Sequence, residues 1–300
     1  MAYRQCPKRL WLEIHQPELR DDSGAEGAFA TGRAVGDVAQ RVFDPKGDGT
    51  NLDPHAIGWD ESAEQTKALM EEGGRSGFEA LFRIPGAMAL ADVMRPDPDY
   101  SALLWEMIEV KASGSVKDYH RDDVAIQTYI AEESGVPLSK SGIAHIDTSF
   151  VYEGDENYDG LFHVEDLTEE ARSRREEVMA WMQEAQSIAG MAKPPEVEVG
   201  AHCTEPYACG FCAHCWKDVV VPEDPFAMLP RLRANKRAMF EDENIERLED
   251  IPSDWLSGKQ ARVQEAHLRG EIYFDAAAAQ ARLNYSGPAY FLDFETIKFA

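Results

Sequence analysis

The residues best suited to chemistry lie between Phe78 and Ser113, where three short apolar runs follow one another and are separated by turn-forming or polar residues: 78–84, 88–94 and 103–110. Asp92 stands near the end of the second run, and Glu109 and Lys111 stand two apart on the third. Side chains two apart on a strand point to the same face, so Glu109 and Lys111 project together. Antiparallel pairing of the last two strands would bring Asp92 to the same place. Two carboxylates and an ammonium at one point of a sheet suit a hard cation, Mg²⁺ or Mn²⁺, with a charge stabiliser beside it.

Charged side chains at strand ends are also common on protein surfaces, so these three residues could simply be solvated. Their neighbours favour a site. Asp92 follows the apolar residues 88–91 and Glu109 follows a largely apolar run, so both acids end strands that we expect to be buried. A buried carboxylate needs a partner, and a metal ion is a better partner than water.

The motifs ADVM at residues 91–94 and IEVKAS at residues 108–113 resemble the core of the PD-(D/E)XK nucleases. The resemblance is specifically to the RecB-like branch, which includes CRISPR-associated exonucleases with an iron–sulfur cluster. It implies an α/β fold, with a mixed central sheet flanked by helices, and metal-dependent hydrolysis of DNA by an exonuclease acting on single strands or ends. Asp92, Glu109 and the Val110 carbonyl would bind Mg²⁺ or Mn²⁺, and Lys111 would steady the attacking water or the scissile phosphate.

Two helices are expected beside these strands, at residues 28–43 and 116–133. The first resembles the opening helix of the nuclease core, but Gly36 stands where many RecB-like relatives carry a metal-binding His. The second carries Gln127, which matches the motif Gln of the family and would contact the site, although a Gln on an amphipathic helix is often solvated. The usual partner of this Gln, a Tyr four residues on, is here Ala131. A fourth strand is expected at residues 140–152, and one long packing helix at residues 168–190.

Four cysteines fall within residues 201–216, which read AHCTEPYACGFCAHCW, and a fifth cysteine is Cys6. In a chain without a secretory leader, this usage favours thiolate ligands in a reducing compartment over disulfides. The spacing C-x2-C-x2-C suits an iron–sulfur loop, and four tetrahedral thiolates suit Zn²⁺ equally, with His202 and His214 allowing a mixed zinc site. Cys6 taken alone is more typical of a small core residue.

The resemblance favours a [4Fe–4S] cluster with Zn²⁺ as the alternative, because the iron–sulfur members of this branch hold a cluster with one N-terminal and three C-terminal cysteines. By the cysteine pattern of those relatives, the implied ligands are Cys6, Cys203, Cys209 and Cys215, and Cys212 is the spare or alternative ligand. Such a cluster would connect residue 6 to the end of the domain. Its binding free energy would then stabilise the fold, so it would be a clasp that need not do redox work.

The expected organisation is a nuclease domain with its cysteine cluster at residues 1–217, a helical linker region at 218–285, and the first strand of a second domain at 286–300. The motif YFLDFET resembles the first motif of DEDD-type, RNase H-like exonucleases, which implies that Asp293 and Glu295 belong to an incomplete second metal site. The chain as a whole resembles the N-terminal part of a family that fuses these two domains. The densest basic group is either a solvated helix face or a phosphate contact: Arg231, Arg233, Lys236 and Arg237.

Composition sets the outer limits. The 300 residues are 44% hydrophobic and 28% charged, as in ordinary globular proteins. No apolar run reaches the ~18 residues of a membrane span, and no leader is evident, so we expect a cytoplasmic protein without a membrane partner. The net charge of −25 lowers non-specific affinity for nucleic acid but leaves room for local cationic patches. The leading hypothesis is a DNA nuclease. The alternative is a nuclease-like protein that binds nucleic acid or a protein partner without cleavage and uses a structural metal cluster.

Overall fold

The computed structural model describes residues 1–98, 104–219 and 224–283. The chain divides into two compact units, the first formed by Met1–Lys217 and the second beginning at Asp218. Throughout these described ranges, none of the helices combines the length and the apolar character needed to cross a membrane.

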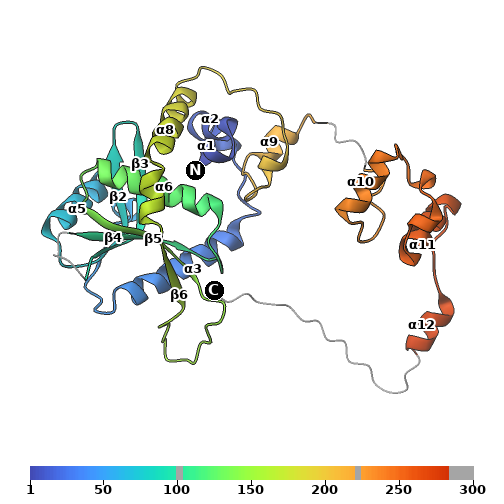
Figure 1. The fold of residues 1–300 in the computed structure, drawn as a ribbon, viewed down its shortest axis with the longest axis horizontal. Helices are drawn as coiled ribbons and strands as arrows, with labels where there is room; N and C mark the ends of the chain where they lie inside the picture. Colours follow the sequence, from blue (N-terminus) through green and yellow to red (C-terminus); the bar gives the residue numbers. More distant parts are fainter. Residues whose placement is uncertain (99–103, 220–223, 284–300) are drawn as a thin grey trace. The chain divides into compact units, whose positions relative to one another are not determined.

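A six-stranded mixed sheet is the centre of the first unit (Figure 1). Its strands neighbour one another in chain order: β1 (Thr50–Asn51), β2 (Gly77–Ile84), β3 (Ala87–Pro96), β4 (Trp105–Lys111), β5 (Leu138–Ile146) and β6 (Phe162–Asp166). β1 is parallel to β2 and β4 is parallel to β5, whereas the other neighbours are antiparallel. The three successive strands predicted from the sequence are confirmed, and so is the antiparallel pairing of the last two.

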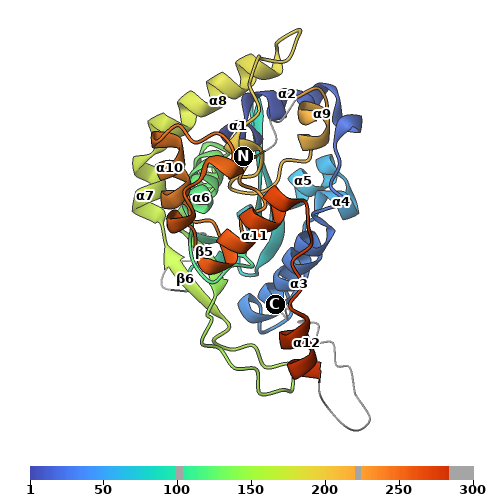
Figure 2. The ribbon, with the colours of Figure 1, turned by 90° about the vertical axis from the view of Figure 1, so that its right-hand side faces the viewer.

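Helices cover both faces of this sheet, and nine are described in the first unit: α1 (Ala2–Gln5), α2 (Pro7–His15), α3 (Glu26–Phe43), α4 (Pro54–Ile57), α5 (Trp59–Glu72), α6 (Asp118–Glu133), α7 (Thr168–Ser173), α8 (Arg175–Ala189) and α9 (Cys212–Trp216). α3 packs Ala39 and Phe43 against one face, and α6 packs against the other (Figures 1 and 2). An α/β protein with a mixed open sheet flanked by helices is therefore confirmed.

The core has two layers because the sheet is apolar on both sides. On the α3 side, Phe78, Val93 and Ile108 form a cluster with the helix. On the α6 side, Met94, Met107 and their neighbours pack against α5 and α6. Burial on both faces explains why β4 has an apolar run and not a strict alternation of apolar and polar residues. A charged side chain on this strand is therefore surrounded by protein.

Several predicted boundaries are wrong. The single helix predicted over residues 168–190 is divided at Arg174, where the backbone turns and the guanidinium pairs with Asp122 of α6 and Glu177 of α8. The turn lets α7 pack on α6 and β5 while α8 packs on α2. The strand predicted over residues 140–152 ends at Ile146, because the carboxylate of Asp147 accepts hydrogen bonds from Ser149 and starts a turn. Strands β1 and β6 were not predicted.

The described part of the second unit is helical, as predicted, with α10 (Ala234–Asp242), α11 (Gly258–Arg269) and α12 (Ala276–Leu283). Phe226, Phe240 and other apolar residues form its own small core. Within the basic group, the Arg237 guanidinium binds Asp224 through bonds of 3.0 and 2.6 Å. This pairing favours a structural role for Arg237. Asp293, Glu295 and the strand predicted at residues 286–300 lie outside the described residues.

Candidate functional site

The predicted carboxylate site lies where β3 and β4 separate. Their paired register ends at Val93–Ile108, so Asp92 and Glu109 come directly after the last pair. Asp92 Oδ2 accepts a hydrogen bond of 2.7 Å from the Val110 backbone N–H. The carboxylate of Asp92 therefore takes the place of a backbone partner at the point where the ladder opens, and this holds it beside β4.

Glu109 and Lys111 project from β4 toward α6, which supplies two polar side chains. Lys111 Nζ donates to Glu109 Oε1 at 2.5 Å and to Asp123 Oδ2 at 2.9 Å. Gln127 Nε2 donates to Glu109 Oε2 at 2.8 Å. The Glu109 side chain is 8% exposed and that of Lys111 is 23% exposed, so the ammonium is the more accessible of the two. The structure thus places all four predicted side chains in one group.

Negative charge exceeds positive charge in this group. Burial, followed by repulsion from Asp92, raises the pKa of Glu109 to about 8. Burial also raises the pKa of Asp92 to about 6, although the Lys111 ammonium opposes the shift. Burial alone would lower the pKa of Lys111, but Glu109 and Asp123 outweigh it and raise that pKa. One ammonium does not neutralise these carboxylates, which is the electrostatic condition that favours binding of a cation.

Three further polar residues of this group were not predicted. Asp123 stands one helical turn before Gln127, so the four-residue spacing could have identified it. His120 Nδ1 accepts the Lys117 backbone N–H at 3.2 Å. Burial and the nearby Lys111 lower the pKa of His120 to about 4, so the imidazole is neutral near pH 7. The third is Glu79 of β2, whose pKa rises to about 7 because of burial and the charge of Glu109.

These residues suit a divalent ion that keeps several of its water ligands better than an ion surrounded entirely by protein ligands. Across the described residues, no group of three or more His, Cys, Asp or Glu is arranged to hold a metal ion. The site offers the carboxylates of Asp92 and Glu109, and the resemblance adds the Val110 carbonyl. Mg²⁺ commonly uses one or two carboxylates while it keeps several waters. Gln127 is 6% exposed and its Oε1 has no hydrogen-bond partner within the described structure. A buried unpartnered oxygen beside Glu109 is what a bound water or ion would satisfy.

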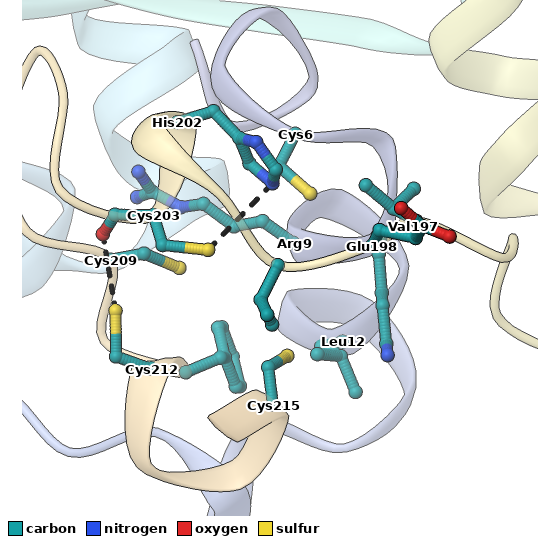
Figure 3. A pocket seen from close by; sticks show the side chains of 13 residues that line it. Cys6, Arg9, Leu12, Val197, Glu198, His202, Cys203, Cys209, Cys212 and Cys215 are labelled. Carbon is teal, nitrogen blue, oxygen red and sulfur yellow. Dashed lines mark hydrogen bonds between the residues drawn. The ribbon is translucent and has the colours of Figure 1, made fainter. Parts of the chain in front are cut away.

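The second candidate site is a pocket lined by all five cysteines (Figure 3). Cys6 is buried at the junction of α1 and α2. The other four come from the segment that contains the 3-10 turn η2 (Ala201–Cys203) and α9. The structure thus brings Cys6 to the C-terminal cysteines, although 197 residues separate it from Cys203. His202 also lines this pocket, whereas His214 is not among its lining residues.

Contacts outside the cysteines hold the two sides of this pocket together. The Gln5 amide donates to the carbonyl oxygens of His202, Glu205 and Tyr207 at 2.9, 3.3 and 2.7 Å. Phe211 is buried in one cluster with Trp11 and Leu12 of α2. Trp11 Nε1 also donates to the Met191 carbonyl oxygen at 2.8 Å. The pocket is therefore assembled by packing and hydrogen bonds that do not involve sulfur.

The thiols surround this pocket without converging on one point. All five cysteines are unpaired. Cys212 Sγ donates to the Cys203 carbonyl oxygen at 3.1 Å, and Cys203 Sγ lies 3.7 Å from His202 Nε2 (Figure 3). Burial raises the pKa of the Cys209 and Cys215 thiols. A single Zn²⁺ needs its ligands to converge, which the described groups do not do. An iron–sulfur cluster instead binds each thiolate to a different iron.

An aromatic contact connects the two candidate sites. The rings of Tyr119 on α6 and Tyr207 in the cysteine segment meet edge to face, with centroids 5.9 Å apart. Tyr119 precedes His120, and the same helix carries Asp123 and Gln127. The segment that carries the thiols therefore packs on the N-terminal turn of the helix that positions Lys111.

Comparison of the chain with protein-family models, with curated proteins and with solved structures found no match.

Proposed function

We propose that the protein is a metal-dependent nuclease of the RecB-like PD-(D/E)XK type that hydrolyses DNA phosphodiester bonds at single strands or ends. The observation that carries this proposal is the grouping of Asp92, Glu109, Lys111 and Gln127 where β3 and β4 separate. The mixed sheet with α3 on one face and α6 on the other is compatible with the restriction-endonuclease-like core.

In this proposal, Asp92 and Glu109 hold Mg²⁺ or Mn²⁺ together with the Val110 carbonyl. The ion, when bound, polarises the phosphate and lowers the pKa of a bound water. Lys111 offsets the negative charge that develops on the phosphate, and its bond to Asp123 aims the ammonium. Gln127 fixes the orientation of Glu109 through one carboxylate oxygen, which leaves its own Oε1 for a water molecule.

For the cysteine pocket we propose a [4Fe–4S] cluster bound by Cys6, Cys203, Cys209 and Cys215. Support comes from the position of these thiols around one pocket and from the hydrogen bond that Cys212 makes to a backbone carbonyl. The cluster would connect α2 to the C-terminal segment and would stabilise the fold. Zn²⁺ is the alternative occupant.

A second function is favoured by specific observations: the chain would bind nucleic acid or a protein partner without cleaving. Both Glu109 oxygens already accept hydrogen bonds from Lys111 and Gln127, and Gly36 supplies no side-chain ligand. In this case the thiol pocket would be purely structural.

A cleavage assay separates these functions. The purified protein is incubated with an end-labelled single strand in Mg²⁺, in Mn²⁺ and in EDTA, beside Lys111→Ala and a matched surface variant, Lys67→Ala. The proposal expects metal-dependent products from the wild type and from Lys67→Ala only. Binding of the strand without any products would favour the second function. Products that persist in EDTA or in Lys111→Ala would contradict the site.

A further inference from the structure

Glu79 has a backbone conformation that is unusual for its position. It lies inside β2, yet its φ is +56°, in the left-handed region. Residues other than glycine seldom adopt this region, and inside a strand it is an outlier that the surrounding structure must maintain.

This conformation changes which face of the sheet the neighbouring side chains occupy. In a regular strand Phe78, Ala80 and Phe82 would share one face. Here Phe78 packs in the core beside α3, whereas Ala80 and Phe82 pack in the core beside α5 and α6. The strand therefore switches faces at Glu79.

The switch occurs opposite Asp92. The pairs Phe78–Val93 and Ala80–Ala91 enclose Glu79 and Asp92, so the two acids stand across from each other on neighbouring strands. β2 thus adds a third strand to the group formed by β3 and β4. Left-handed backbone at this position brings a carboxylate to the point where β3 and β4 separate.

Glu79 has no partner of opposite charge there. Its side chain is half-buried and, within the described residues, makes no hydrogen bond or ion pair. The charges that act on it are those of Glu109 and Asp53, and it acts in turn on Asp92. Lys111 is already bonded to Glu109 and Asp123. Gln127, which is nine-tenths buried, provides a separate sign of a ligand, because its Oε1 is unpartnered next to Glu109.

Helix α3 has no side chain at the position where the resemblance places a metal ligand. A side chain added at Gly36 would meet nothing within 4 Å, so this position is open. The donor that the resemblance places on α3 is absent, and Glu79 approaches the same pair of acids from the sheet.

We propose that Glu79 belongs to the metal site and accepts hydrogen bonds from waters of a divalent ion held by Asp92 and Glu109. This inference rests on the proposed function. Glu79 would act through metal-bound water molecules, because the described carboxylates are not arranged as a group of three around one ion. Residues that orient metal-bound groups in this way typically change metal affinity about 10- to 100-fold when they are replaced.

The test measures binding of Mn²⁺ to the purified protein by calorimetry, with no substrate present. Glu79→Gln keeps the shape and removes the charge, and Glu79→Gly also removes the backbone strain. We expect both to weaken Mn²⁺ binding about tenfold or more. We also expect Glu79→Gly to raise the melting temperature in EDTA above that of Glu79→Gln. Circular dichroism checks that each variant is folded.

Asp155→Gly is the matched control, since Asp155 is an exposed acid with φ of +55°. It should remove similar strain without changing Mn²⁺ affinity. Wild-type Mn²⁺ affinity in both Glu79 variants would overturn this inference and leave the proposed function standing. A wild-type protein that binds no Mn²⁺ would overturn the metal site of the proposed function and this inference together.

Discussion

The carboxylate site and the cysteine pocket are held together by different kinds of contact. Asp92, Glu109 and Lys111 are placed by the register of adjacent strands, and α6, the next element in the chain, completes the group. In the cysteine pocket, Cys6 and Cys203 line one cavity because contacts such as those of Gln5 and Trp11 connect segments about 200 residues apart. One site follows from local topology, and the other depends on the whole unit being folded.

The two sites also differ in the strength of the hydrogen bonds that their functional side chains make. In the carboxylate site, Lys111 and Gln127 engage both oxygens of Glu109. In the pocket, the thiols of Cys203, Cys209 and Cys212 each make a weak sulfur hydrogen bond, to His202, Phe211 and the Cys203 carbonyl oxygen respectively. Under the proposed function, the carboxylate geometry should therefore survive loss of the ion, and the proposed cluster would add stability to a pocket that other contacts already assemble.

The largest effect is expected from the carboxylate site. Lys111→Ala removes the only ammonium that contacts Glu109 within the described residues. We expect cleavage to fall by about 100-fold or more, because a charge aimed at the transition state is lost. Because Glu109 and Asp92 then repel each other without a cation, the melting temperature in EDTA should also fall, and Mg²⁺ should restore part of it. Cleavage at the wild-type rate in Lys111→Ala would contradict the proposal that the carboxylate site is catalytic.

Loss of the proposed cluster comes next. Cys6→Ser should reduce iron from about four atoms per chain to near zero and lower the melting temperature, since metal binding contributes to folding. Cys212→Ser is the matched substitution and should keep most of the iron, because Cys212 bonds to a carbonyl. Iron analysis, visible absorption and thermal denaturation measure these effects. Full iron in Cys6→Ser would mean that the N-terminal ligand is wrongly assigned.

A smaller effect tests the sulfur-free contacts of the pocket. Gln5→Ala removes an amide that bonds three carbonyl oxygens, so we expect the free energy of unfolding to fall by about 1–3 kcal/mol. Metal binding at Asp92 and Glu109 should be unchanged. Chemical denaturation and Mn²⁺ titration measure the two quantities. A changed Mn²⁺ affinity in Gln5→Ala would contradict the view that the two sites are held together independently.

The smallest effect is a pH dependence of metal-free stability. The pKa of Glu109 rises from 4.5 to about 8 on folding, so the folded state binds more protons than the unfolded chain between these values. This stabilising contribution is complete below pH 4.5 and is lost as the pH rises through 8. We expect the free energy of unfolding in EDTA to fall by about 1 kcal/mol per pH unit between pH 6 and 8. Glu109→Gln should reduce this slope above pH 7, where the other raised carboxyl, Glu79 with a pKa of about 7, contributes less. An unchanged slope would contradict the burial of charge at Glu109.

The sequence is sufficient to predict the central strands and the group formed by Asp92, Glu109 and Lys111. Apolar runs and two-residue spacing depend on local chain geometry, and both are visible in the sequence. The contact of Gln127 with Glu109 came from the resemblance. Asp123 could have been found from its spacing to Gln127. In contrast, the left-handed backbone of Glu79 could not be predicted, because the surrounding strands impose it on a residue that rarely adopts it.

The division of α7 from α8 was missed for a related reason. The pattern of residues 168–190 is helical throughout, and only the pairing of Arg174 with Asp122 of another helix shows why it turns. The sequence predicts which cysteines could be ligands of the pocket but not how they are arranged in space. The contact of Gln5 with the Tyr207 carbonyl, which helps to assemble the pocket, leaves no pattern in the sequence.

The early position of α2 has a consequence for synthesis of the chain. Trp11 and Leu12 are buried against Phe211, about 200 residues later. At about 5–20 residues per second, a ribosome needs roughly 10–40 s to extend the chain that far. During this time the apolar face of α2 has no Phe211 to cover it, while the strands between are already available for pairing. Burial of Trp11 and Leu12 by Phe211 therefore has to wait until the segment that carries the four C-terminal cysteines has been synthesised.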